Sequence, residues 1–170
     1  MNDIAVASKR GRRTLYTYFK NKEEIYYAVI QSELERLSDK MEEVAAMDIA
    51  PEQKVLLLIY THLNMVKEIV SRNGNLRAEF FRNIWGVERV RKSFDCEERE
   101  LFCNVLEEGC RAGKFRIENV QLMADIIHYC VKGLEVPYIY GRLGEGLTEA
   151  GSRPIVVGLV RRALGINWNY

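Results

Sequence analysis

The stretch from Lys22 to about Met47 constrains the fold more than any other part of the chain. Its apolar side chains recur at intervals of four and three residues, at Ile30, Leu34, Leu37, Met41 and Val44. This period places them on one face of an α-helix, while the charged residues between them form the solvated face. The pattern therefore predicts one long amphipathic helix over residues 22–47, which can belong to two parts of a molecule and couple them.

The rest of the chain has the same helical character. A second helix is predicted over residues 51–72, because Pro51 suits a first helical turn and only a narrow polar stripe interrupts the apolar residues. Such a helix belongs in the centre of a bundle. Further helices are predicted over residues 95–112, ending at Gly113, over 119–134 and over 152–164, with a short aromatic helix over 76–85. Residues 86–95 are expected to form a loop or a short helix.

The composition is typical of a globular protein that can bury a core. Of the 170 residues, 48% are apolar and 29% are charged. The longest apolar run, Val55 to Tyr60, is far too short to span a bilayer, and no secretory pattern opens the chain. With three prolines and little β-branched alternation, the protein is expected to be all-α and cytoplasmic, without a membrane partner.

The first 22 residues concentrate positive charge. Six lysines and arginines stand there against the single acid Asp3, a formal charge of +5, whereas the whole chain carries +1. A basic end on a slightly acidic body indicates contact with a polyanion. An unstructured basic arm is the alternative, and it is weakened by the apolar and aromatic residues among the charges, which need something to pack on.

The same stretch predicts two short helices around a turn. Asn2 or Asp3 can cap a first helix, Gly11 ends it, and residues 12–19 can form a second helix. Leu15 and Phe19 share its inner face by their spacing of four. The following residues predict an Asn cap on the long helix, with an acid at the capping-box position. Two helices around a short glycine-containing turn, the second one basic, are typical of a helix-turn-helix that enters a major groove.

At these residues the chain resembles a known family. Ile4-Ala5, Thr14-Leu15-Tyr16-Thr17-Tyr18-Phe19 and Lys20-Asn21-Lys22-Glu23-Glu24-Ile25 are similar, without gaps, to the DNA-binding signature of TetR-family bacterial regulators, roughly I-A-x-x-A-G-V-S-x-x-T-L-Y-x-Y-F-x-x-K-E-x-L. A second similarity, to the G-x-x-x-G-x-F-R turn common in the ligand-binding domains of that family, lies at 108–116. The resemblance therefore touches both ends of the fold.

The resemblance departs from the family pattern at two places. Where the family usually has Ala-Gly-Val-Ser in the turn, this chain has Ser8-Lys9-Arg10-Gly11. Family members also carry a further helix before the first one seen here. The expectation is that this helix is encoded upstream of Met1, or that the helix-turn-helix is incomplete and defective.

The resemblance implies a two-part protein. Residues 1–24 would form a partial helix-turn-helix, linked by the helix over 22–47 to a helical ligand-binding and dimerisation domain over 25–170. The implied function is a transcriptional regulator that binds duplex operator DNA as a homodimer, acts as a repressor and is released by a small, mostly apolar effector. The alternative is a dimeric small-molecule-binding helical protein whose DNA-binding head is defective or truncated. No cofactor is expected.

Seven residues of the head are candidates for contact with DNA. Arg12, Arg13 and Thr14 are expected at base edges or nearby phosphates. Backbone phosphates are expected at Tyr16, Tyr18, Lys20 and Lys22, the last of which is helped by the N-terminus of its helix.

The body offers candidates for an effector pocket and for a dimer interface. The pocket candidates are aromatic and polarisable residues on the inner helices: Tyr60, Met65, Phe80, Phe81, Trp85, Phe102, Cys103 and Tyr129. Ordinary core packing is the alternative for each of them. The helix over 119–134 has two apolar lines and therefore two partners, which favours pairing of the last two helices with a second copy through Leu122, Ile126, Tyr129, Ile155, Gly158, Leu159 and Arg162.

Neither the cysteines nor the histidines form a recognisable reactive site in the sequence. Cys96, Cys103 and Cys110 recur every seven residues, which separates them by about 10.5 Å along a helix, too far for a disulfide. They are expected to be small buried residues, with a thiol sensor as the minority alternative. His62 and His128 lack an i, i+4 partner for a zinc site, and no nucleophile accompanies His128 and Asp125. Neither an enzyme nor a metal site is expected.

One consequence for DNA binding can be tested directly. If Lys22 holds a phosphate, Lys22→Ala weakens binding to all duplex sequences alike and lowers the slope of log affinity against log salt by about one unit. Fluorescence anisotropy at several salt concentrations measures both effects. A loss confined to particular sequences would contradict the phosphate role.

Overall fold

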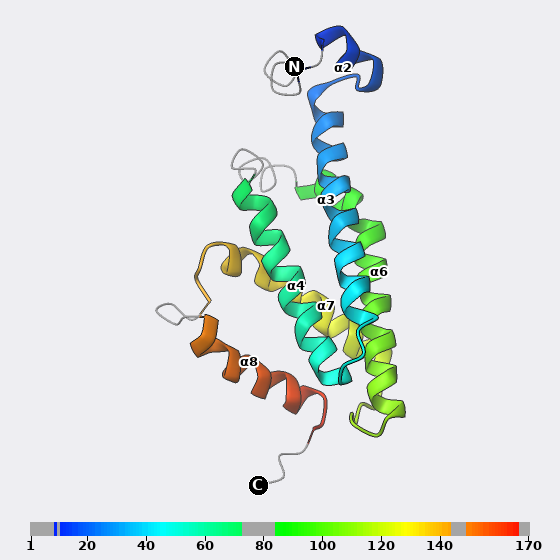
Figure 1. Ribbon diagram of the computed structural model, residues 1–170, viewed down its shortest axis with the longest axis vertical. Helices are drawn as coiled ribbons and strands as arrows, with labels where there is room; N and C mark the ends of the chain where they lie inside the picture. The colour runs from blue at the N-terminus through cyan, green and yellow to red at the C-terminus, as the bar shows by residue number, and fades with distance from the viewer. Residues whose placement is uncertain (1–8, 10, 73–83, 144–148, 167–170) are drawn as a thin grey trace.

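The computed structural model describes residues 9, 11–72, 84–143 and 149–166 of the 170-residue chain. Every regular element in this part of the chain is an α-helix (Figure 1). The helices are α2 (Arg12–Tyr18), α3 (Lys22–Ala45), α4 (Pro51–Arg72), α6 (Ile84–Arg111), α7 (Val120–Ile139) and α8 (Glu149–Ala163). The all-α prediction is therefore confirmed, and the predicted first helix of the head lies outside the described residues.

The predictions for α2, α3 and α4 agree with the structure to within two residues. Asn21 Oδ1 accepts a hydrogen bond from the backbone N–H of Glu24 at 2.8 Å and so caps α3. The carboxylate of Glu24 accepts a hydrogen bond from the backbone N–H of Lys20 at 2.7 Å. The first bond satisfies a donor that the start of α3 leaves free, and the second joins the residue before the cap to the first turn of α3.

The prediction for α6 is wrong at its start. The helix begins at Ile84 rather than near Asp95, so residues 86–95 are helical and not a loop. The buried line of this segment is Val87, Arg91, Phe94 and Glu98, each at most 4% exposed. Two of those four residues are charged, and a search for apolar periodicity therefore misses the helix.

The last two helices are longer than predicted. α7 continues to Ile139 through Pro137, and α8 begins at Glu149 instead of Ser152. The start of α7 agrees with prediction, because Asn119 accepts a hydrogen bond from the backbone N–H of Leu122 at 2.9 Å. Pro137 removes one helical N–H, yet Tyr140 still donates to the carbonyl oxygen of Val136, so the helical turn closes beyond the proline.

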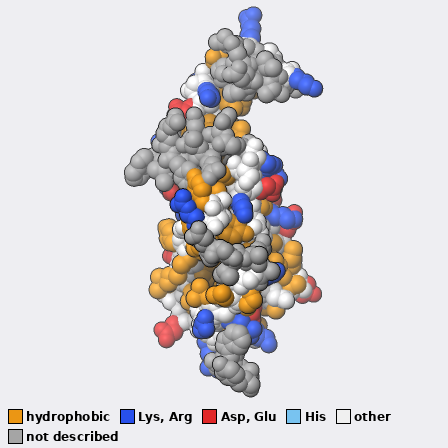
Figure 2. All heavy atoms as spheres, turned by 90° about the vertical axis from the view of Figure 1, so that its left-hand side faces the viewer, with side chains coloured by type: hydrophobic (Ala, Val, Ile, Leu, Met, Phe, Trp, Pro, Cys, Tyr) orange, Lys and Arg blue, Asp and Glu red, His pale blue; other side chains and the backbone are white. Residues whose placement is uncertain are grey.

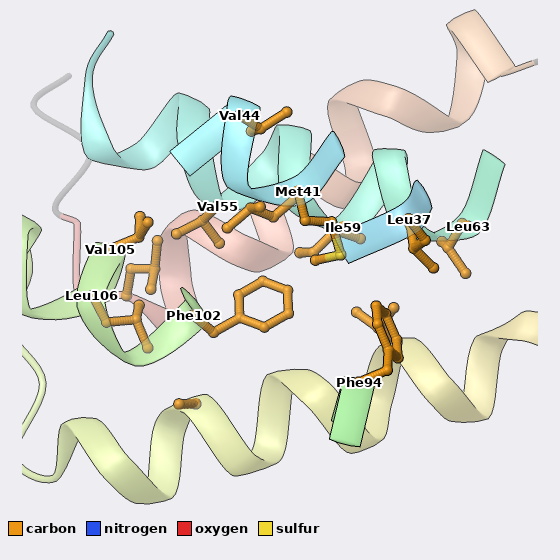
Figure 3. Packing of buried hydrophobic residues seen from close by; sticks show 14 of the residues in the cluster. Leu37, Met41, Val44, Val55, Ile59, Leu63, Phe94, Phe102, Val105 and Leu106 are labelled. Carbon is orange, nitrogen blue, oxygen red and sulfur yellow. The ribbon is translucent and has the colours of Figure 1, made fainter. Parts of the chain in front are cut away.

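The core lies where α3, α4 and α6 pack together, with α7 across them. In Figure 3 the ring of Phe102, which is fully buried on α6, points toward Met41 of α3 and Val55 of α4. α2 stands at the end of α3 that points away from α7 and α8 (Figure 1). The predicted long helix thus runs from the segment after α2 into this core, and the division into two domains linked by it stays a prediction.

The turn after α6 explains the second similarity seen in the sequence. Gly113 has a φ of +67°, and the N–H groups of Gly113 and Lys114 donate to the carbonyls of Cys110 and Gly109. This is the hydrogen-bond pattern of a Schellman motif, in which glycine takes the left-handed position. The ring of Phe115 then folds back onto Gly109, where an added Cβ would lie 2.1 Å from the ring.

The cysteines are less buried than predicted. Cys96 and Cys130 are exposed, and Cys103 and Cys110 are half-buried, all four as free thiols. The residues beside them on α6, such as Phe102 and Leu106, fill the core instead. The prediction of a buried cysteine face is therefore wrong, because the seven-residue line runs along the rim of the core.

Among the described residues, no helix combines the length and the apolar character that crossing a membrane requires.

Two glycine substitutions are expected to act in opposite directions. Gly109→Ala places a Cβ against the buried ring of Phe115 and should lower the free energy of unfolding by about 1–3 kcal/mol. Gly133→Ala on α7 meets no atom within 4 Å and should raise it by up to about 1 kcal/mol. Urea unfolding measures both changes. Equal effects of the two substitutions would show that the contact between Gly109 and Phe115 is not the reason for the glycine.

Candidate functional site

The head presents its polar and aromatic side chains outward. Arg13, Thr14, Tyr16, Tyr18, Lys20 and Lys22 are exposed, Tyr18 to 75%. Leu15 and Phe19 are half-buried on the opposite side of α2, as their spacing predicts. Arg12 lies in the first turn of α2, and its side chain is outside the description. The structure thus places six of the seven predicted DNA-binding side chains on the exposed surface of one short segment.

The turn before α2 adopts a conformation that usually requires glycine. Lys9 has a φ of +53°, whereas Gly11, the N-cap of α2, has a φ of −64°, which any residue can adopt. Lys9 stands where TetR-like sequences usually have the turn glycine. A side chain in this left-handed conformation costs roughly 1–2 kcal/mol. Gly11, two residues after the glycine position of the family, therefore does not supply the left-handed residue of the turn. Lys9 adopts that strained conformation instead.

A small hollow lies between α3, α4 and α6. Its described lining is Ile30, Glu33, Leu34, Val66, Ile69, Val70 and Arg91, and it encloses about 40 Å³. Apart from Glu33 and Arg91, these side chains are aliphatic. Glu33 also pairs with Arg72 at 3.1 Å, which ties α3 to α4 beside the hollow. We refer to this hollow as the three-helix pocket.

The predicted pocket residues whose side chains the structure describes are not among the described lining of the three-helix pocket. Phe102 is fully buried in the core, Met65 and Tyr60 are half-buried, and Tyr129 is 62% exposed. The Sγ of Cys103 donates to Gln121 Oε1 at 3.4 Å. Phe80 and Phe81 lie outside the described residues, as does the side chain of Trp85. The aliphatic residues that do line the pocket belong to the apolar stripes of α3 and α4, where the sequence does not distinguish a pocket wall from a core.

A network of buried ionisable side chains crosses the body beside this pocket. Its members are His62 on α4, Arg91 and Glu98 on α6, and His128 and Glu135 on α7, each at most 4% exposed. We refer to these five residues as the buried ion network. None of the five is identified as a network member by the sequence, because their partners lie 30 to 73 residues away.

Glu98 and Glu135 hold the network together. One oxygen of Glu98 bonds Nδ1 of His62, and the other bonds Nδ1 of His128 at 2.6 Å. Glu135 accepts from Nε2 of His62 at 2.8 Å and from both terminal nitrogens of Arg91 at 2.7 and 2.9 Å. Glu135 therefore receives hydrogen bonds from α4 and from α6 at once.

Both ring nitrogens of His62 face carboxylate oxygens, so the ring donates twice and carries a positive charge. Burial alone would lower the pKa of His62, but the hydrogen bonds to Glu135 and Glu98 raise it to about 9. Burial would likewise raise the pKa of Glu135, but the hydrogen bond from His62 and the charge of Arg91 lower it to about 2. The charges of His62 and Arg91 balance those of Glu98 and Glu135, which is the condition for burying them.

The structure gives His128 and Asp125 different partners. His128 bonds Glu98, while Asp125 pairs with Arg99 at 3.2 Å. Within the described ranges, no three His, Cys, Asp or Glu side chains are arranged to hold a metal ion.

The residues predicted for the dimer interface are mostly exposed apolar side chains of α7 and α8. Leu122, Ile126 and Tyr129 on α7 are 55%, 48% and 62% exposed, and Ile155 and Leu159 on α8 are 63% and 62% exposed. Arg162 is exposed as well, whereas Gly158 is buried within the chain itself. Figure 2 looks onto the side of the body that carries α8, where hydrophobic side chains gather over the lower half.

Comparison with known proteins identifies the class of fold. No family model matches the chain. Over 68 residues, 40% of the chain, it is 35% identical to two uncharacterised HTH-type transcriptional regulators of Mycobacterium tuberculosis, from strains CDC 1551 / Oshkosh and ATCC 25618 / H37Rv. The match covers 34% of the length of each relative, so the matched part of the chain spans about a third of those proteins.

Two solved structures match almost the whole chain. A bacterial regulatory protein of the TetR family from Rhodococcus RHA1 superposes with a TM-score of 0.64 and 16% identity, covering 98% of this chain and 86% of that one. A Clostridium perfringens protein described as a fatty acid metabolism regulator gives a TM-score of 0.62 and 20% identity, covering 96% and 86%. The chain therefore has the fold of TetR-family regulators, and the resemblance read from its sequence is confirmed at the level of the fold.

The buried ion network predicts a specific dependence of stability on pH. Because folding raises the pKa of His62 from 6.5 to about 9, its contribution is complete below pH 6.5 and is lost as the pH rises through 9. The lowered pKa of Glu135 gives a contribution that is complete above pH 4.5 and is lost as the pH falls through 2. Between pH 6 and 9 the free energy of unfolding should fall by on the order of 2–3 kcal/mol.

Urea unfolding at several pH values measures this loss, and His62→Gln provides the comparison. The variant should be less stable at pH 6. Its free energy of unfolding should also fall less between pH 6 and 9, because residue 62 then has no proton to release. If the free energy of unfolding of His62→Gln falls as much between pH 6 and 9 as that of the unmodified chain, the pH dependence belongs to other groups.

Proposed function

We propose that the protein is a transcriptional regulator that binds duplex DNA as a homodimer and is released from it by a small apolar ligand. The observation that carries this proposal is the continuity of α3. One end of this helix bears the exposed basic head, and the middle of it forms a wall of the three-helix pocket. A regulator with no catalytic step needs this connection between a binding head and a ligand-sensing body.

The exposed residues of the head match the two kinds of contact that DNA recognition needs. Arg12, Arg13 and Thr14 occupy the first turn of α2, which we assign to base edges and nearby phosphates. The rest of the head surface, Tyr16, Tyr18, Lys20 and Lys22, is assigned to the phosphate backbone. The hydrogen bonds of Asn21 and Glu24 support this role, because they tie Lys20 to the first turn of α3 beside Lys22.

The exposed apolar side chains of α7 and α8 support pairing with a second copy. Leucine, isoleucine and tyrosine side chains more than 45% exposed are costly to leave in water when they lie together. A two-fold axis through this surface would bring two heads to matching half-sites of an operator. We therefore propose a homodimer formed through α7 and α8.

The three-helix pocket supports a neutral, mostly apolar effector. Its lining is largely aliphatic, and the charge of Arg91 is already matched by Glu135 and Asp95. The hollow of about 40 Å³ is far smaller than the ~300–1,000 Å³ of a typical ligand site. A ligand would therefore bind best to a form in which α4 has moved away from α3 and α6, and this difference in affinity is what a release mechanism requires.

The proposal can be tested with the full chain and DNA selected from a random duplex library. Binding measured by fluorescence anisotropy should weaken steeply as salt rises, with two protein copies per duplex by sedimentation. Arg13→Ala should reduce affinity for the selected sequence by a factor of about ten or more, because it removes a contact of 1–3 kcal/mol.

Lys40→Ala is the matched control, because it removes the same charge from the exposed face of α3 within the body. This variant should bind DNA as the unmodified chain does. Equal behaviour of Arg13→Ala and Lys40→Ala, or no salt-dependent binding at all, would refute DNA recognition by the head. That outcome would leave a helical ligand-binding protein without a working head.

A further inference from the structure

Glu135 occupies an unusual position relative to the three-helix pocket. It lies on α7, which contributes none of the described lining residues, yet its carboxylate is held by side chains from two helices that form walls of the pocket. Arg91 on α6 lines the pocket directly. His62 on α4 lies one turn before Val66, another lining residue.

We propose that Glu135 senses the separation of α4 and α6 and passes the occupancy of the three-helix pocket to α7. The inference rests on the proposed function, and it adds the route by which a ligand would alter the dimer surface. His62 and Arg91 bond the same oxygen, Oε1, at 2.8 and 2.7 Å. A ligand that pushes α4 away from α6 cannot leave both bonds intact.

Because Glu135 is buried, its bonds to His62 and Arg91 are expected to break one at a time rather than lengthen gradually as α4 and α6 separate. Every member of the buried ion network is at most 4% exposed, so a broken bond cannot be replaced by water at the surface. A carboxylate left without its partner in such a place is strongly destabilising. Glu135 is therefore expected to follow one of its two partners, and α7 moves with it.

The partly exposed charged pairs between α6 and α7 lack these properties, unlike the buried pair of Glu98 and His128, which belongs to the same network. Arg99 and Asp125 are each about a third exposed, and Lys132, which is 20% exposed, bonds Asp95 and Glu88. None of these residues lines the pocket. Because solvent can replace such contacts, they should tolerate a shift of α6 without moving α7.

The side chains beside Glu135 connect it to the proposed dimer interface. Leu134 and Val136 are 36% and 39% exposed on α7. Val136 comes seven residues after Tyr129 and so continues its exposed line toward the end of the helix, while Leu134 lies on the other side of Glu135. A displacement of Glu135 would therefore change the surface through which two copies pair.

The neutral apolar dye N-phenyl-1-naphthylamine can serve as the probe, with hydrogen–deuterium exchange of α7 as the readout. In the unmodified chain, probe binding should change the exchange of residues 131–139 by on the order of threefold or more. In Arg91→Lys, which keeps the charge but loses the forked contact, the response of α7 should disappear while that of α3 and α4 remains. Arg99→Lys makes the same chemical change at a pair outside the pocket and should respond as the unmodified chain does.

Three results would overturn the inference. The first is an unchanged response of α7 in Arg91→Lys, and the second is no response of α7 in the unmodified chain despite bound probe. The third is unchanged probe binding in Leu34→Trp, which fills the pocket and should abolish binding there. Should Arg91→Lys not fold, Glu135→Gln replaces it, because the amide keeps the shape and the acceptor oxygen but loses the charge that holds both partners.

A second measurement separates this inference from the proposed function. Linkage requires the probe to weaken DNA binding by the same factor by which DNA weakens probe binding, typically about 5–150-fold. Arg91→Lys should reduce this factor to nearly one, whereas Arg99→Lys should keep it. Absence of DNA binding by the unmodified chain would refute the proposed function alone, since the exchange of α7 still decides the role of Glu135.

Discussion

Burial of two carboxylates, Glu98 and Glu135, determines how the helices of the body are arranged. Each carboxylate taken out of water must find donors, and here His62, Arg91 and His128 supply them from three different helices. A hydrophobic contact tolerates sliding, but these hydrogen bonds fix distance and direction. The relative positions of α4, α6 and α7 are therefore set by the network, and the surrounding aliphatic core fills the space that it leaves.

The same constraint gives the pocket its character. Glu135 balances the charge of Arg91. The three-helix pocket therefore has a largely aliphatic wall although it lies beside five ionisable groups. The head is organised differently, because its described charged side chains, such as Arg13, Lys20 and Lys22, face solvent. The molecule thus keeps its positive charge outward where a polyanion would bind, and pairs its charges inward where a neutral ligand would bind.

Apolar periodicity predicts α3 and α4 nearly to the residue, because their buried faces are built from aliphatic side chains. It fails at the start of α6, where Arg91 and Glu98 occupy buried positions and the pattern is interrupted by charge. The ion network is beyond sequence reasoning of this kind, since each of its bonds joins residues far apart in the chain. The pocket is missed for the opposite reason: Leu34, Val66 and Val70 look like any other core residues until the helices are placed.

The head is carried by a single helix whose 24 residues span about 36 Å. Such a rod magnifies small rotations: a tilt of about 10° at the body would displace its far end by roughly 6 Å. In a pair of molecules, two such rods would have to keep their tips about one turn of duplex apart, near 34 Å. A modest rearrangement among packed side chains would then suffice to move both heads out of alignment with the successive major grooves of the duplex.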